Sequence, residues 1–250
     1  MKREREPYIG ITGFMSLAEV GMALTFHSPF CPRKLMVGVL ASGKTLSGTK
    51  NKWPGRYPNP AAIAEIFPVS DRTINLIHYA TDDKKTLSGQ LDELVRLGGP
   101  NLDGFQLNVA WPEPAALRGL RGKRVVLQLG KRALEKTKND PRRTADRLGA
   151  YLTDPVITDV LIDASGGRGI PLNIRVAEAH VREIGGRYPE LGVGVAGGLS
   201  CSNVWQVGLL GELSLRVSID AEGRLRTADD EMDPAAVQAY LLAAARVFGS

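Results

Sequence analysis

Two glycine-rich turns are the part of this chain best suited to binding chemistry, and each of them follows a short apolar run. The first turn follows residues 160–163 and the second follows residues 192–196. A strand, a glycine-rich turn and a helix place free backbone N–H groups at a helix N-terminus, which stabilises a bound phosphate. The sequence therefore predicts a phosphorylated small molecule held by Gly166, Gly167, Gly169, Gly197 and Gly198.

A second group consists of polar residues near the ends of other apolar runs. Side chains alternate between the two faces of a strand, so a polar residue between two apolar ones points to the opposite face. The residues on this inner face are Gln106, Asn108, Gln128, Asp163, Ser218 and Asp220. In the run 73–79 the alternation leaves either Asn75 or His78 there. Any one of these residues could equally well be a buried polar side chain whose hydrogen bonds are all made within the protein. Taken together, they indicate a ligand site.

The elements that must position these residues alternate along the chain. The predicted strands cover residues 8–12, 35–41, 73–79, 104–108, 124–129, 157–163, 192–196 and 213–219. The predicted helices cover residues 17–26, 61–66, 87–97, 113–120, 142–152, 172–184, 202–209 and 234–247. Eight strand–helix units are typical of an α/β fold, the (βα)8 TIM barrel. We predict one such domain over residues 1–250, with its chemistry at the carboxyl ends of the strands.

The composition argues against several other classes. Hydrophobic residues make up 43% of the chain and charged residues 24%, as is typical of globular domains. Cys31 and Cys201 form neither a metal-ligand pattern nor a disulfide framework, and His27, His78 and His180 fall on no ligand spacing. No apolar run is long enough for a bilayer, and none forms a signal core. We expect a cytoplasmic protein with no metal, no cofactor and no membrane contact.

Much of the net charge of +5 comes from a basic stretch at residues 118–147. Such a cluster could attract nucleic acid, but this one has no interleaved aromatic residues and no recognised binding motif. We interpret it as solvated surface and expect no nucleic-acid partner. The oligomeric state has no signature in the sequence, although the outer helices of a barrel can support a homodimer.

One connection, residues 42–60, is too long for a simple turn and follows the second predicted strand. Loops of this length in a compact domain are usually functional lids or disordered segments. Lys44, Lys50, Lys52 and Arg56 could reach an anionic ligand at the mouth of the barrel. The alternative is a solvated loop.

Residues 38–45, GVLASGKT, match the P-loop pattern G-x-x-x-x-G-K-[ST]. A P-loop needs a helix directly after its Lys and Thr, because the helix N-terminus binds the phosphates. Residues 46–55 contain Gly48, Pro54 and Gly55 and cannot form a stable helix. Gly38 also lies within a predicted strand rather than after it. A P-loop NTPase is therefore the least favoured function.

Short motifs along nearly the whole chain resemble, in the same order, those of phosphoribosylanthranilate isomerase, an enzyme of tryptophan biosynthesis. They are IGIT at 9–12, GFQLN at 104–108 (family VQLHG), LID at 161–163 (LLDS), GGRG at 166–169, AGGL at 196–199 (AGGL), NV at 203–204 (NV) and SIDAEG at 218–223 (DVSSG). Several phosphate-binding barrels share the glycine turns. The order and spacing of the motifs are more specific than any one of them.

The resemblance implies a barrel of the ribulose-phosphate-binding type and an Amadori rearrangement of a phosphorylated aminoaldose to an aminoketose. This reaction needs an acid that opens the ribose ring and a base that takes a proton from the adjacent carbon. Asp163 matches the family's acid, and Asp220, in the last motif, joins the glycines of the phosphate site. The remaining substrate-binding candidates are Thr12, Lys44, Gln106, Asn108 and Gln128.

The chain departs from the family at several of these positions. The family's base is a first-strand cysteine in the pattern K-x-C-G, whereas residues 7–10 read PYIG. Asn108 replaces the usual His, and Lys44 is the nearest substitute for a second-strand Arg. His78 has a suitable pKa to replace the base if it points inward, and packing between sheet and helix is the alternative.

We therefore expect an isomerase-type enzyme that acts on a phosphorylated sugar or sugar amine, with Asp163 as acid and His78 as the replacement base. The alternative is a non-catalytic barrel that binds a phosphate ligand as a sensor or assembly partner. The substitution Asp163→Asn separates the two, because an enzyme loses turnover while a binding protein keeps most of its affinity.

Overall fold

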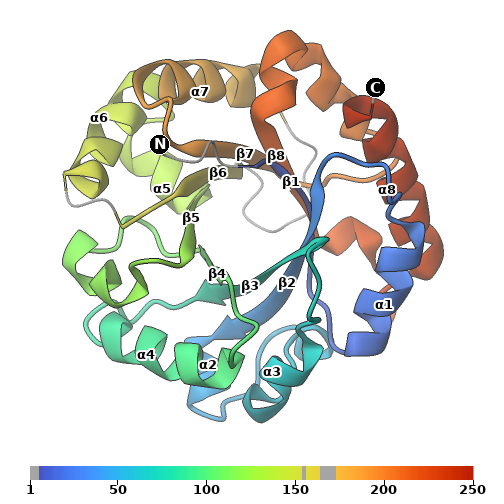
Figure 1. The fold of residues 1–250 in the computed structure, drawn as a ribbon. Helices are drawn as coiled ribbons and strands as arrows, with labels where there is room; N and C mark the ends of the chain where they lie inside the picture. Colours follow the sequence, from blue (N-terminus) through green and yellow to red (C-terminus); the bar gives the residue numbers. More distant parts are fainter. Residues whose placement is uncertain (1–5, 154–155, 164–172, 250) are drawn as a thin grey trace.

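The computed structural model describes residues 6–153, 156–163 and 173–249. Within them, eight parallel strands pair in chain order, and β8 pairs with β1 to close a barrel (Figure 1). The strands are β1 (Tyr8–Thr12), β2 (Lys34–Ser42), β3 (Thr73–Ala80), β4 (Gly104–Leu107), β5 (Arg124–Gly130), β6 (Asp159–Asp163), β7 (Gly192–Ala196) and β8 (Val217–Ala221). The predicted α/β TIM barrel is confirmed.

Helices cover the outside of the barrel, as Figure 1 shows. The α-helices are α1 (Leu17–Phe26), α2 (Gly43–Leu46), α3 (Ile63–Ile66), α4 (Leu87–Gly98), α5 (Lys131–Lys136), α6 (Pro141–Leu152), α7 (Ile174–Arg187) and α8 (Pro234–Phe248). The 3₁₀ segments are η1 (Pro54–Arg56), η2 (Pro60–Ala62), η3 (Pro114–Leu120), η4 (Val204–Arg216) and η5 (Gly223–Leu225). The last helix packs against the first and completes the ring. Among the described residues, no helix is both long and apolar enough to cross a membrane.

Side-chain caps determine where several helices begin. The Ser16 hydroxyl accepts a hydrogen bond from the backbone N–H of Glu19 at the start of α1. The Asp233 carboxylate accepts hydrogen bonds from the backbone N–H groups of Ala235 and Ala236 at the start of α8. These oxygens satisfy N–H groups that have no partner within the helix. Both helices therefore begin at the residue that the sequence predicts.

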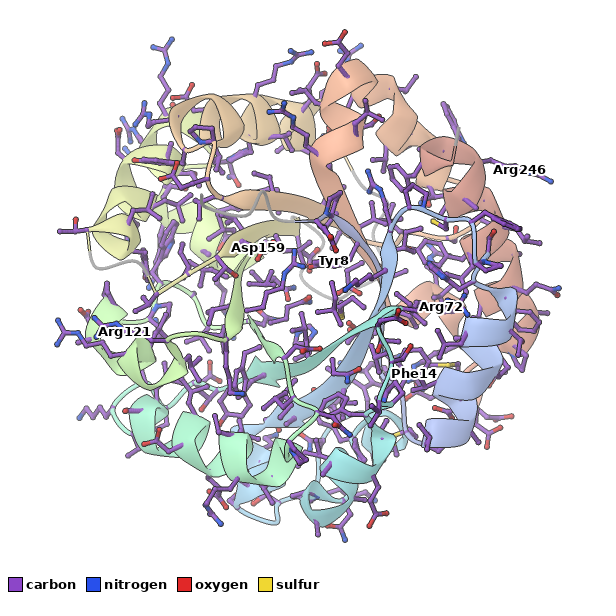
Figure 2. The ribbon with its side chains drawn as sticks, viewed as in Figure 1. Tyr8, Phe14, Arg72, Arg121, Asp159 and Arg246 are labelled. Carbon is purple, nitrogen blue, oxygen red and sulfur yellow. The ribbon has the colours of Figure 1, made fainter. Side chains whose placement is uncertain are left out.

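The interior of the barrel is apolar in its amino-terminal half. The buried apolar cluster inside the barrel consists of Tyr8, Met36, Ile74, Leu76, Val126, Leu161 and Ala196, and Ala196 is the member at the carboxyl end. At the start of β5 and β6, Arg124 Nη2 lies 2.5 Å from Asp159 Oδ1, and the guanidinium lies 4.9 Å from the centre of the Tyr8 ring. Figure 2 shows Tyr8 and Asp159 near the middle of the barrel. Packed and paired side chains fill this end, which leaves the carboxyl ends of the strands as the place where a TIM barrel carries its site.

The eighth strand begins later than predicted. We predicted a strand over residues 213–219, whereas β8 covers Val217–Ala221 and the preceding residues belong to η4. The buried guanidinium of Arg33 donates hydrogen bonds to the carbonyls of Ser214 and Val217, at 2.7 and 2.5 Å. These bonds hold the chain in a turn before the strand. Arg33 is far from this segment in the sequence, so the local pattern of apolar residues could not predict where β8 begins.

Smaller differences concern short helical segments. The segment predicted as a helix over residues 113–120 is the 3₁₀ segment η3, and the sequence did not predict α5 at all. Helices of one or two turns show too little of the 3.6-residue period to be recognised from sequence.

Candidate functional site

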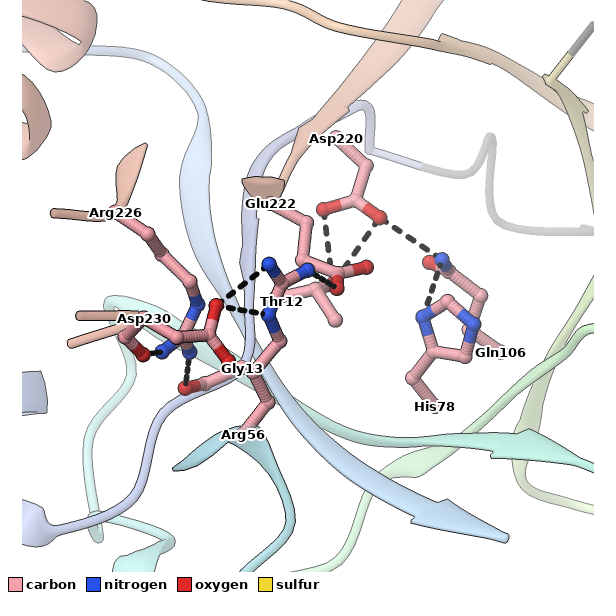
Figure 3. Close-up of polar contacts among 9 residues, drawn as sticks. All are labelled: Thr12, Gly13, Arg56, His78, Gln106, Asp220, Glu222, Arg226 and Asp230. Atoms are coloured by element: carbon pink, nitrogen blue, oxygen red, sulfur yellow. Dashed lines mark hydrogen bonds and ion pairs between the residues drawn. The ribbon is translucent and has the colours of Figure 1, made fainter. Parts of the chain in front are cut away.

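A chain of hydrogen bonds crosses the mouth of the barrel at the carboxyl ends of the strands. Gln128 Nε2 on β5 donates to Asp163 Oδ2 on β6, and Gln106 Nε2 on β4 donates to Asp220 Oδ2 on β8, both at 2.8 Å. The two amides meet where Gln106 Nε2 donates to Gln128 Oε1 at 3.2 Å. The Thr12 hydroxyl on β1 lies 3.0 and 3.1 Å from the two Asp220 oxygens. We call these five residues the polar chain, and Figure 3 shows its Asp220 end.

The two carboxylates orient the amides of the polar chain. A carboxylate accepts hydrogen bonds, so Gln128 directs its NH₂ group toward Asp163 and its carbonyl toward Gln106. Gln106 then presents its own NH₂ group to that carbonyl and to Asp220. Its Oε1 atom is buried and has no hydrogen-bond partner among the described residues. An unsatisfied buried acceptor costs about 1–3 kcal/mol, and such groups in a native structure are often functional.

Asp220 has strongly altered acid–base properties. Burial raises the pKa of its carboxyl group to about 7. The hydrogen bonds from Gln106 and Thr12 lower this pKa, whereas the nearby charges of Glu222 and Asp163 raise it further. A carboxyl group with a pKa near neutrality can both accept and donate a proton under ordinary conditions.

We predicted Asp220 as part of the phosphate site, together with the glycines, and that role stays a prediction. In the structure its carboxylate belongs to the polar chain. The ionised form would repel a phosphate rather than bind it.

His78, rather than Asn75, lies on the inner face of β3. The ring Nδ1 of His78 is 3.2 Å from Gln106 Nε2. Asn75 lies nearer the amino-terminal end of the strand, where its amide donates to the backbone carbonyls of Pro68 and Asn101. The condition for a role of His78 in the site, an inward side chain, is met.

The electrostatic surroundings of His78 favour a neutral ring. Burial lowers the pKa of His78, and the charges of Glu222 and Asp163 oppose that effect in part. A proton on Nδ1 would face the amide hydrogens of Gln106. The neutral imidazole therefore carries its proton on Nε2, which makes that atom a hydrogen-bond donor.

A cleft of about 1230 Å³ opens outward from the polar chain, and Asp163, Gln128 and Asn108 are part of its lining. Lys44 on α2 also lines this cleft. Thr12 and Gln106 do not, because both side chains are fully buried in the barrel. The predicted substrate-binding residues are thus divided between the surface of the cleft and the layer beneath it.

The glycine turn after β7 has a backbone that favours glycine. Gly197 has φ of 121° and Gly198 has φ of 55°, both in the region that side chains disfavour. The Asn203 side chain holds the turn, because Nδ2 donates to the Gly198 carbonyl and Oδ1 accepts from the Ser200 N–H, both at 2.8 Å. η4 begins at the next residue, so a helical N-terminus follows the turn. The other predicted glycines, Gly166, Gly167 and Gly169, lie outside the described residues.

Arg56, in the long connection after β2, is engaged by the segment after β8. Its Nη1 lies 2.8 Å from Glu222 Oε1, and its Nη2 lies 2.6 Å from Asp230 Oδ1. Arg226 donates to the backbone carbonyls of Asp230 and Gly13. Figure 3 shows this Arg56 cluster beside the polar chain. Because two carboxylates already hold the guanidinium, the structure removes Arg56 from the candidates for binding an anionic ligand.

The P-loop-like segment lacks the context of a nucleotide site. Only one helical turn, α2, follows β2, and the Thr45 hydroxyl caps that turn by hydrogen bonding to the backbone N–H of Ser42. Gly38 lies inside β2 beside Thr12, where an added Cβ would stand 2.4 Å from the Thr12 hydroxyl. This glycine serves close packing between strands. The structure therefore supports the sequence argument against an NTPase.

Sequence reasoning missed Glu222, whose charge acts on both His78 and Asp220. The alternation that places Ser218 and Asp220 inward extends to Glu222, so the signal was present. We treated that stretch only as part of a glycine motif. Within residues 6–153, 156–163 and 173–249, no group of three His, Cys, Asp or Glu side chains is placed to hold a metal ion.

Comparison of the sequence with family models and with curated proteins finds no match. Solved structures do match. TrpF from Jonesia denitrificans is 18% identical with a TM-score of 0.61, over 96% of this chain and 98% of that one. Phosphoribosylanthranilate isomerase from Thermus thermophilus is 15% identical with a TM-score of 0.64, over 96% and 99%. The fold is that of phosphoribosylanthranilate isomerase.

The resemblance predicted from the strand-end motifs is thus confirmed at the level of the fold. A phosphoribosylanthranilate isomerase in complex with reduced 1-(o-carboxyphenylamino)-1-deoxyribulose 5-phosphate also matches, at 12% identity and a TM-score of 0.60, over 95% of this chain and 98% of that one. The departure in the first strand remains. The inward positions of β1 are Tyr8, Gly10 and Thr12, and none of them is a cysteine.

Proposed function

We propose that this protein is an aldose–ketose isomerase that acts on a phosphorylated sugar or sugar amine. The observation that carries the proposal is the polar chain, which holds two carboxylates, Asp163 and Asp220, at the mouth of the barrel. Moving a carbonyl from C1 to C2 requires one group that gives a proton to oxygen and one that takes a proton from carbon. Paired carboxylates in different surroundings can divide these two tasks.

Asp163 is the group that we assign to protonation of the sugar oxygen. It lines the cleft, where a ligand can reach it, and Gln128 fixes its orientation. The position also corresponds to the acid of phosphoribosylanthranilate isomerase in the sequence resemblance, so two independent lines of argument support this role.

Asp220 is the group that we assign to proton removal from carbon. Its pKa of about 7 allows it to accept a proton and return it in the same turnover at neutral pH. This role replaces the one that we first gave to His78. The lone pair of His78 Nδ1 faces the Gln106 amide, so the ring serves better as an Nε2–H donor to a substrate oxygen.

The phosphate of the substrate belongs, in this proposal, at the turn formed by Gly197 and Gly198. The positive φ angles of Gly197 and Gly198 shape this turn, and the helical segment η4 begins at Val204 directly after it, as in other phosphate-binding turns. The solved isomerase complex with a 5-phosphate ligand on the same fold supports this class of substrate. A role in tryptophan biosynthesis is part of the proposal, and the first assay tests it.

The experiment measures turnover of phosphoribosylanthranilate by the loss of its anthranilate-type fluorescence. The wild-type chain is compared with Asp163→Asn, Asp220→Asn and the control Asp71→Asn, which removes an exposed carboxylate before β3. We expect turnover in the wild type and the control, and a loss of about 10²–10⁴-fold in each of the other two. Unchanged turnover in Asp163→Asn would contradict the proposal.

A second function stays open because β1 lacks the base found in the related isomerases. A barrel that only binds a phosphorylated ligand needs the glycine turn but no proton transfer. In that case the wild type shows no turnover of phosphosugars, and Asp163→Asn binds ribulose 5-phosphate about as tightly as the wild type does.

A further inference from the structure

The cleft beyond Asp163 is larger than a single sugar phosphate requires. Its volume of about 1230 Å³ exceeds the roughly 300–1,000 Å³ that is usual for small-ligand sites. It extends from Asp163 over the ends of β3 and β5, between α2 on one side and α5 on the other. The glycine turn after β7 is not part of its lining. The proposed phosphate site and the far end of this cleft therefore lie on different sides of the reacting centre.

Basic side chains predominate in this cleft. They are Lys44, Lys52, Lys84, Lys131, Arg132 and Lys136. Arg132 is paired with Asp82 at 2.8 Å and Lys131 lies 3.7 Å from Glu135. Within the part of the chain that the structure describes, Lys44, Lys84 and Lys136 form no ion pair with a carboxylate.

The acidic residues of the lining are mostly engaged elsewhere. Asp83 accepts hydrogen bonds from the Thr86 hydroxyl and the Lys85 backbone N–H, which stabilise the turn before α4. Asp82 holds Arg132. In the described part of the chain, neither Asp82 nor Asp83 forms an ion pair with Lys44, Lys84 or Lys136. Glu93 and Asp163 also line the cleft, and its six basic residues outnumber these four acidic ones.

The charged form of Lys84 lies in unfavourable electrostatic surroundings. It is half-buried, and its ammonium group donates a hydrogen bond to the carbonyl of Ala110, which fixes its position. Burial lowers the pKa of Lys84, and the charges of Lys136 and Arg147 lower it further. The charges of Glu113 and Asp82 oppose this shift, but the pKa stays lowered. An anion bound beside Lys84 and Lys136 would relieve their repulsion.

We propose that this cleft binds a second phosphate group of the substrate, through Lys84, Lys136 and Lys44. The ligand that binds most tightly is then an elongated sugar derivative with a phosphate at each end and its reacting carbons between them, over Asp163. A dianion matches several unpaired lysines better than a single carboxylate does, and lysine binds phosphate as a point charge. The assignment to a substrate rests on the proposed function, whereas the phosphate site itself does not.

The test uses calorimetry on the chain of residues 1–250 to compare two ligands, ribulose 5-phosphate and ribulose 1,5-bisphosphate. The variant is Lys84→Gln/Lys136→Gln, and the control is Lys85→Gln/Lys138→Gln, which removes the same charge from exposed neighbours outside the cleft. Thermal unfolding confirms that each variant is folded. We expect the wild type to bind the bisphosphate at least about tenfold more tightly than the monophosphate.

The Lys84→Gln/Lys136→Gln variant should bind the bisphosphate no more tightly than the monophosphate. The affinity of this variant for the monophosphate should stay within about twofold of the wild-type affinity. The control variant should behave like the wild type. Equal affinities for both ligands in the wild type would overturn the second site. An equal loss in the control variant would also overturn it, because the effect would then be general electrostatics.

The same set of measurements separates this inference from the proposed function. If the wild type isomerises a monophosphorylated substrate but does not prefer the bisphosphate, the second site is wrong and the isomerase stands. If the bisphosphate preference depends on Lys84 and Lys136 but no phosphosugar is turned over, the site stands and the isomerase is wrong.

Discussion

The two ends of the barrel interior differ in how they stabilise a buried carboxyl group. At the amino-terminal end, Asp159 is paired with Arg124, and apolar side chains pack above them. At the carboxyl end, Asp220 accepts hydrogen bonds from Thr12 and Gln106 and forms no ion pair with a cation within the described part of the chain. The paired end is built for stability. The unpaired end keeps a carboxyl group with a pKa of about 7, which is costly for folding and useful for proton transfer.

The largest expected effect is on catalysis at the carboxyl end. The substitution Asp220→Asn should reduce turnover of the phosphosugar by about 10²–10⁴-fold, because the amide cannot take a proton from carbon. The substitution Asp159→Asn should leave turnover per folded molecule unchanged, since that residue lies at the opposite end. Equal losses in both variants, measured at saturating substrate, would remove the functional distinction between the ends.

The next effect is the pH dependence of stability. Folding raises the pKa of Asp220 from about 4 to about 7, so the folded state favours its protonated form. Its contribution to the free energy of unfolding is therefore complete below pH 4 and is lost as the pH rises toward 7, by about 4 kcal/mol. Urea unfolding of the wild type relative to Asp220→Asn, between pH 4 and 8, measures this loss. A constant difference across that range would contradict it.

At a fixed pH, breaking the ion pair between Arg124 and Asp159 should lower the free energy of unfolding more than breaking the ion pairs of Arg56 does. The substitution Asp159→Asn leaves Arg124 largely buried without its carboxylate, which should lower the free energy of unfolding by about 3 kcal/mol. The reference is Asp220→Asn at pH 8, which removes a buried charge and should stabilise the chain. Urea unfolding of both variants tests the contrast, and a stabilised Asp159→Asn would break it.

The smallest effect is expected at the Arg56 cluster. The substitution Arg56→Gln breaks the ion pairs with Glu222 and Asp230, whose side chains are partly exposed. We expect a loss of about 1 kcal/mol in the free energy of unfolding. Lys50→Gln in the same connection is the matched control and should have no effect. If Arg56→Gln lowered the free energy of unfolding by more than Asp159→Asn does, the Arg56 cluster would contribute more to stability than the amino-terminal ion pair.

Sequence reasoning predicted much of the fold because its signals are local. Alternating apolar runs and the spacing of eight strand–helix units indicated the barrel, and seven of the eight strands were placed to within two residues. The eighth was misplaced because Arg33, which is distant in the sequence, donates hydrogen bonds to the carbonyls of Ser214 and Val217 where the strand begins.

The site was predicted in part for the same reason. Inward residues such as Gln106, Gln128 and Asp163 follow from the two-residue period of a strand, and the structure joins them into one network. The pairing of Arg56 with Glu222 did not follow, because the lid-like composition of its loop carries no information about a partner 166 residues away.

The sequence by itself indicated most of the residues that face into the barrel and the glycine turn after β7, since strand period and turn chemistry act over a few neighbouring residues. Only the tertiary structure decided what those residues can do. The raised pKa of Asp220 arises from burial, and its hydrogen bond with Thr12 joins residues 208 positions apart. Burial and long-range contact are properties of the closed barrel, and no local stretch of the chain contains them.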